Sequence, residues 1–304
     1  MEEILNNNFR RNSFLLFSIL IAAICLLVRY GLLPHWNPAL SRHATEIIAT
    51  LVEDLFTTLV TAVLVGVFIV WVTPAIMRRA NIEPIEPKGI STLLQEAAIQ
   101  STIWTFKGGM GRYTRVATLP TLVKQARKSG TRRKIRIMLI DPDNEKLCLS
   151  YALYRNGVRS SKGESPLTAD LVRDQILATI LTAAKVSISE SLLDVELFVL
   201  PSWSVMRIDL SDLYMVMTSE DPGEPGLRAD NRTHFYDTYS KDLDLQSKQG
   251  RGLPQLDSFS QIAIHEPEDL IDLMNRLGLD HSNFDLARLE KIWKLMGEKS
   301  HQYA

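Results

Sequence analysis

Two long apolar runs near the start of the chain constrain its fold more than any other feature. The first run, Ser13–Leu33, carries a single charge at Arg29, and the second, Leu55–Ile76, carries none. About 20 helical residues cross a hydrocarbon core of about 30 Å, and a helix satisfies its own backbone hydrogen bonds there. The sequence therefore predicts two transmembrane helices.

The arginines that flank these runs predict the orientation of the helices. Arg10 and Arg11 precede the first run, and Arg78 and Arg79 follow the second. Because Lys and Arg favour the cytoplasmic side, we expect a multi-pass hairpin over residues 1–80 with both termini in the cytoplasm. A cleaved signal peptide would usually have a shorter apolar core and a small-residue cleavage site, whereas this run is longer, lacks a convincing site and is followed by a second run.

Polar residues form a stripe along the second predicted helix. The stripe comprises Glu46, Thr50, Glu53, Thr57 and Thr61. Their spacing of three or four residues places them on one helical face. Polar side chains near lipid normally face other helices or water. Three interpretations are therefore open. The stripe packs against other helices, it lies on a part of the helix that extends beyond the bilayer surface, or it lines a pore made by several copies.

The segment 81–89 contains two prolines and a glycine and is predicted to be a linker to a cytosolic domain over residues 90–304. In that domain, β-branched and alternating runs predict strands, whereas periodic apolar runs predict helices. The expected strands cover 102–106, 134–140, 195–200, 205–210 and 213–218. The expected helices cover 91–100, 119–128, 145–155, 169–185 with Thr168 as N-cap, 233–249, 268–277 and 284–297. This order predicts a mixed α/β sheet with packed helices.

A basic region lies between residues 97 and 140, where ten Lys or Arg occur without an acidic residue. Its first part has Lys107, Arg112 and Arg115 around three glycines after a predicted strand. Backbone amides and cations in such a loop can bind an anion, although the spacing matches no standard nucleotide motif. A plain glycine turn with solvated arginines explains the same pattern.

The second part of the basic region is a run of closely spaced cations. It comprises Lys124, Arg127, Lys128, Arg132, Arg133, Lys134 and Arg136. Such a run suits the phosphates of nucleic acid or of anionic lipid, and it also occurs on solvated helix faces.

The segment 205–212 resembles the HxKxxxxD strand of the phospholipase D superfamily. Val205, Arg207 and Asp212 stand at the positions of the His, Lys and Asp of that motif. The preceding strand–helix–strand, which ends in IMLIDPDN, is also similar to that fold, and the resemblance runs from Thr102 to about residue 230. Because the nucleophilic His is missing, the resemblance implies a domain that has lost hydrolysis and kept a phosphate-shaped groove. Arg207 and Asp212 also suit an ordinary salt bridge.

Other arrangements for catalysis are missing from the sequence. The six histidines have no metal-ligand spacing, no GxSxG segment occurs, and Cys25 and Cys148 stand far apart. We therefore expect no catalytic residues, no metal and no cofactor.

The combination of a two-helix anchor with a non-catalytic α/β domain resembles the membrane effectors of bacterial anti-phage systems, an analogy of architecture. The resemblance implies an inner-membrane toxin that permeabilises the membrane as an oligomer. In a retron, a reverse transcriptase with RNA-linked DNA would restrain it, and the basic run favours such a nucleoprotein partner. The alternatives are a membrane-tethered phospholipase D-like phosphodiesterase or transferase, and a cyclic-oligonucleotide sensor that uses Lys107, Arg112 and Arg115.

Overall fold

The computed structural model describes residues 20–21, 23–32, 42–72, 82–158, 166–256 and 264–299. The chain divides into two compact units, Met1–Arg78 and Arg79–Ala304, and each is described by itself.

The first unit contains the 31-residue helix α4, Arg42–Val72. The π-helical turn η1, Val28–Leu32, contacts it. Within α4, the stretch Glu46–Gly66 is long and apolar enough to cross a membrane, and none of it is buried. Among the residues that the structure describes, this is the one helix that qualifies. The structure thus shows a single candidate span and not the predicted multi-pass hairpin. This span begins nine residues before the predicted run Leu55–Ile76, and parts of both predicted runs, 13–33 and 55–76, lie outside the described residues.

The second unit is built on an eight-stranded mixed sheet with the strand order β1-β7-β6-β5-β2-β3-β4-β8. Strands β2, β3 and β4 are parallel to one another, and the other neighbours are antiparallel. The strands are β1 Glu83–Ile85, β2 Ile103–Lys107, β3 Arg133–Ile140, β4 Leu193–Leu200, β5 Met206–Ser211, β6 Tyr214–Ser219, β7 Gly226–Asp230 and β8 Arg251–Gly252. The predicted mixed α/β sheet is confirmed.

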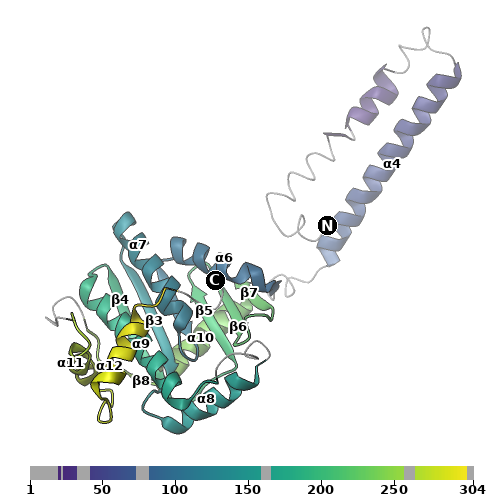
Figure 1. The fold of residues 1–304 in the computed structure, drawn as a ribbon. Helices are drawn as coiled ribbons and strands as arrows, with labels where there is room; N and C mark the ends of the chain where they lie inside the picture. The colour runs from purple at the N-terminus through teal and green to yellow at the C-terminus, as the bar shows by residue number, and fades with distance from the viewer. Residues whose placement is uncertain are drawn as a thin grey trace. The chain divides into compact units, whose positions relative to one another are not determined.

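Helices connect and cover these strands (Figure 1). They are α6 Pro87–Gln100, the π-helical η2 Thr114–Thr118, α7 Leu119–Ser129, α8 Glu145–Gly157, α9 Ala169–Ser189, α10 His234–Gln249, α11 Asp269–Leu277 and α12 Leu286–Met296. The predicted N-cap is confirmed, because the Thr168 hydroxyl accepts a hydrogen bond of 3.1 Å from the Leu171 amide. Each predicted helix and strand of this unit is present, with ends that differ by a few residues.

The predicted linker is wrong for residues 83–89. Strand β1 pairs with β7, and Ile85 is buried in the core. Pro87 begins α6, where a residue without a backbone N–H costs no helical hydrogen bond. The prolines that suggested a joint therefore belong to an edge strand and a helix start.

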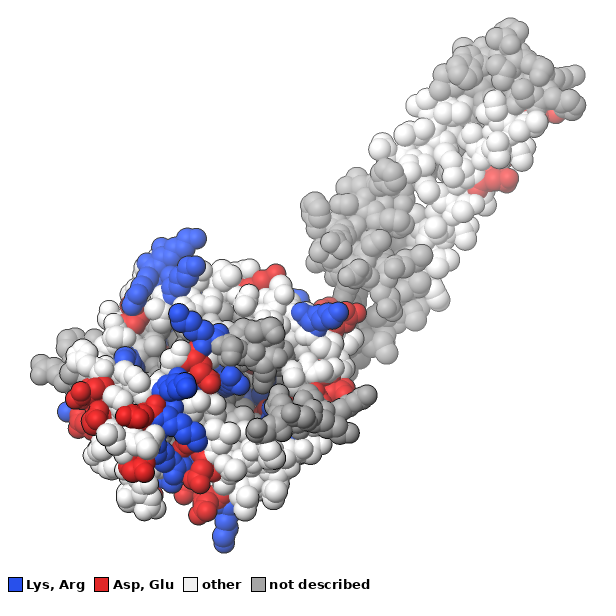
Figure 2. Space-filling model, in the orientation of Figure 1, with Lys and Arg blue, Asp and Glu red and all other residues white. Residues whose placement is uncertain are grey.

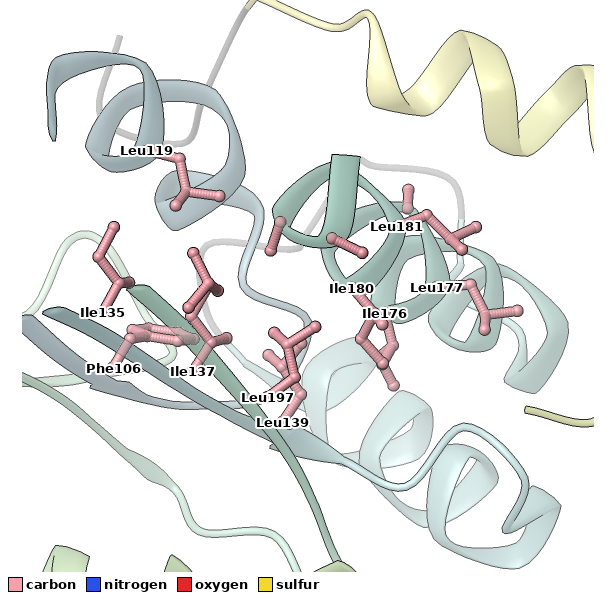
Figure 3. Packing of buried hydrophobic residues seen from close by; sticks show 14 of the residues in the cluster. Phe106, Leu119, Ile135, Ile137, Leu139, Ile176, Leu177, Ile180, Leu181 and Leu197 are labelled. Carbon is pink, nitrogen blue, oxygen red and sulfur yellow. The ribbon is translucent and has the colours of Figure 1, made fainter. Parts of the chain in front are cut away.

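The sheet is covered on both faces, as parallel strands require. On one face, Phe106, Ile137 and Leu139 of the parallel strands meet Ile176 and Ile180 of α9 (Figure 3). On the other face lies a second cluster under α10. Its members are Met138, Leu200, Ile208, Leu210, Met215, Met217, Ala229 and Leu243. Alternate residues of β3 therefore serve opposite faces.

Ile137→Ala tests this packing, since Ile137 is fully buried in a central strand. Removing its buried carbons should lower the free energy of unfolding by about 2–5 kcal/mol. Leu153→Ala on α8 is the control, because Leu153 is 65% exposed and its truncation should have little effect. Denaturant unfolding followed by tryptophan fluorescence measures both, and equal losses would contradict the described core.

Candidate functional site

Helix α4 has one half-buried face, and its other described positions are exposed. The half-buried positions recur every three or four residues and form a single face; they are Ile48, Ala49, Val52, Phe56, Leu59, Val63 and Gly66. The five residues of the polar stripe are all exposed. At 3.6 residues per turn, the two faces are centred about 130° apart. The stripe thus lies away from the half-buried face of the helix.

The threonines of the stripe are bonded to their own helix. The hydroxyl of Thr50 donates to the Glu46 carbonyl at 3.0 Å, that of Thr57 to the Glu53 carbonyl at 2.8 Å, and that of Thr61 to the Thr57 carbonyl at 2.8 Å. Their oxygens keep lone pairs that can accept a hydrogen bond from water. The Glu53 carboxylate has no cationic partner in the described part of the chain. The predicted stripe is therefore one continuous, exposed polar face with an acidic residue at its centre.

The glycines between Phe106 and Arg115 serve packing. A Cβ at Gly109 would collide with the Tyr151 ring, and Gly111 has a φ of +69°, which favours glycine. These contacts explain the glycines without a bound anion.

The three cations around this loop do not converge on one point. Lys107 lines a polar pocket of about 240 Å³ with Asp242 and Gln246 on the α10 side of the sheet. Burial lowers its pKa, and the Asp242 carboxylate partly offsets this effect. Arg112 and Arg115 instead share Glu298, with N–O distances of 3.3 Å and 3.1 Å.

Arg115 is a buried structural arginine, only 2% exposed. It donates to the Gln175 carbonyl at 3.1 Å, the Gln175 side chain at 2.8 Å and the Thr179 hydroxyl at 3.1 Å. Burial lowers its pKa to about 10, and the Glu298 carboxylate acts in the opposite direction. Its guanidinium therefore joins η2 to α9 and is not available to a ligand.

Acidic residues from elsewhere in the chain neutralise much of the basic run. Arg127 pairs with Glu190. Lys134 and Arg136 both bind Glu196, and Arg136 also binds Asp244 of α10.

Arg133 of the same run is buried and donates to the carbonyls of Ala98, Ile99 and Ser101 at the end of α6. A cation suits these carbonyls because the last turn of a helix leaves them without backbone partners. Arg133 therefore acts as a helix cap, a role that the linear run of cations did not reveal.

Three cations of the run remain exposed at the end of α7. They are Lys124, Lys128 and Arg132, and none of them forms an ion pair with a residue that the structure describes. Figure 2 shows Lys and Arg gathered over this end of α7. Beside them lies a groove of about 540 Å³ between α7 and α9, lined by Leu119, Val123 and Val186, among others, with Lys124 and Arg127 at its rim. The groove joins helices far apart in the sequence, so sequence reasoning missed it.

The residues of the phospholipase D-like motif lie at the two ends of β5. Arg207 is buried near its start, whereas Asp212 lies in the turn after it and accepts hydrogen bonds from the Thr102 amide at 3.0 Å and hydroxyl at 2.8 Å. Five extended residues separate their backbones by about 16 Å. Val205, 44% exposed, precedes the strand. No nucleophilic side chain therefore stands at the position of the motif's histidine.

Asp209 of β5 is a buried carboxyl group beside Arg207. Burial raises its pKa to about 6, although the Arg207 charge and the Trp104 indole act in the opposite direction. No group of His, Cys, Asp and Glu suited to a metal ion occurs among the described residues.

No protein-family model and no curated protein matches this chain.

The raised pKa of Asp209 predicts a pH-dependent stability. The folded protein binds the Asp209 proton more tightly than the unfolded chain does, so stability should fall as pH rises from about 4 to about 6, by at most about 3 kcal/mol. Asp209→Asn should remove this part of the dependence. Thermal unfolding at several pH values measures it, and identical profiles for the two proteins would contradict the assignment.

Proposed function

We propose that this protein is a membrane-permeabilising effector in which copies of α4 associate around a water-filled path lined by the polar stripe. The observation that carries the proposal is that the stripe is exposed and lies about 130° from the half-buried face of the same helix. In the proposed form, the run 13–33 supplies a second span, and both termini lie in the cytoplasm of a bacterial cell.

The cost of a carboxylate in lipid supports association. An acidic residue near the centre of a membrane helix costs about 2.5–3.5 kcal/mol on insertion scales, unless it meets water or a partner. Glu53 meets no cation among the described residues. When several copies turn their stripes toward a common axis, each carboxylate and threonine oxygen gains water, as in the polar linings of channels.

The proposed role of the second unit is to restrain this association. A difference of a few kcal/mol between a harmless and a conducting arrangement is sufficient for a switch that a partner biases. By the resemblance to anti-phage effectors, the partner is a nucleoprotein such as a reverse transcriptase with RNA-linked DNA, and loss of restraint arrests or kills the infected cell.

The geometry gives less support to the alternatives. A phospholipase D-like reaction would need the nucleophilic histidine of that motif, and Val205 stands at its position. A cyclic-oligonucleotide site at Lys107, Arg112 and Arg115 would need those cations to converge, and Arg115 is buried.

Substitutions on α4 test the proposal. Thr57→Leu and Glu53→Leu should abolish depolarisation of bacterial cells that express the full chain without its partner, because each replaces a water-facing group by an apolar one. Thr58→Leu is the matched control, since Thr58 also bonds its own helix, to the Asp54 carbonyl at 2.7 Å, and lies about 100° around the axis from Thr57. A potential-sensitive dye reports the effect at equal protein levels.

Two outcomes would contradict the proposal. One is a wild-type chain that leaves the membrane potential unchanged at high expression. The other is a Thr58→Leu variant that loses activity to the same extent as Thr57→Leu.

A further inference from the structure

The groove between α7 and α9 stands directly beside the exposed cations of the second unit. We propose that this site binds single-stranded nucleic acid, with phosphates on Lys124, Lys128 and Arg132 and a base in the groove. The inference rests on the proposed function only in assigning this unit the role of sensing a partner.

The cations supply the electrostatic half of the site. Lys124 and Lys128 are one helical turn apart on α7, so they present their charges side by side. Arg132 follows Gly130, whose φ of +63° ends the helix and starts the turn that leads to β3. All three are exposed and without an ion pair among the described residues, so their charges are available to phosphates.

The groove supplies the apolar half of the site. Its volume of about 540 Å³ lies in the range of pockets that hold small organic groups. Its lining by Pro120, Val123 and Val186 suits the flat face of a base. At the rim, Arg127 is 64% exposed while Glu190 holds its guanidinium, so this plane is available for stacking.

The combination favours single strands over the other anionic partners. A duplex keeps its bases stacked inside, and a bilayer presents its phosphates as a surface; either would use the cations and leave the groove empty. In single-stranded nucleic acid, unpaired bases are exposed next to the phosphates and can enter an apolar site. The groove is thus the feature that favours a single strand over a duplex or a bilayer.

The test is fluorescence anisotropy with the full chain in detergent, using a labelled 20-nucleotide DNA as a single strand and as a duplex. The single strand should bind more tightly. Lys124→Glu and Lys128→Glu should each weaken its binding at least tenfold, and the logarithmic salt slope should be about −2 for three phosphate contacts. Lys248→Glu is the control: Lys248 is also exposed but lies on α10, across the sheet.

Ser189→Trp tests the groove separately. Ser189 is an exposed residue of the groove lining at the end of α9, so the indole should fill the groove without disturbing the core. This variant should weaken binding of the single strand and leave that of the duplex unchanged. Val123→Asn provides a second variant with the same expectation, because it makes the groove polar without adding a charge, and a thermal unfolding curve shows that each is folded.

The inference would be overturned if the single strand did not bind at 50 mM salt, or if Lys128→Glu and Lys248→Glu had equal effects. It would also be overturned if the duplex bound as tightly as the single strand and Ser189→Trp had no effect. Binding to anionic lipid vesicles alone would assign the cations to a membrane surface and would also overturn it. Each of these results leaves the conductance of α4 untouched, so a failure here is distinguishable from a failure of the proposed pore.

Discussion

A carboxylate on a membrane-spanning helix must meet water or a partner, and this requirement governs the proposed account. The candidate span Glu46–Gly66 is apolar enough for a bilayer, yet it carries Glu53 on an exposed face. The threonines of that face bond their own backbone, so they neither hold another part of the chain nor require one. A helix of this kind is tolerated in lipid when identical helices share its polar face around water.

In the second unit, the tertiary structure places acidic residues beside the basic run. Its basic run looks continuous along the chain, but the fold brings Glu190, Glu196 and Asp244 to it. The parallel strands β3 and β4 place Arg136 directly opposite Glu196. Of this run, only the cations at the end of α7 remain exposed without an ion pair among the described residues. They suffice to contact a few phosphates but not to bind a long stretch of nucleic acid.

The sequence predicted the elements of this unit better than its sites. Periodicity identifies α9 and β3 because each carries a long apolar pattern. It cannot identify β1, which has three residues and depends on pairing with β7, far along the chain. Arg115 is buried by partners up to 183 residues away, so no local pattern distinguishes it from the exposed Arg132. The same limit applies to the groove, whose walls come from two helices that meet only in the fold.

The most direct test of the central claim is the water accessibility of single cysteines along α4 in intact membranes. In a chain with Cys25 and Cys148 replaced by alanine, Thr57→Cys and Leu55→Cys place a thiol on the stripe and well away from it. The account predicts that a charged, membrane-impermeant thiol reagent modifies the cysteine at 57 many times faster than that at 55. Equal rates, or no reaction at either position in the conducting state, would contradict it.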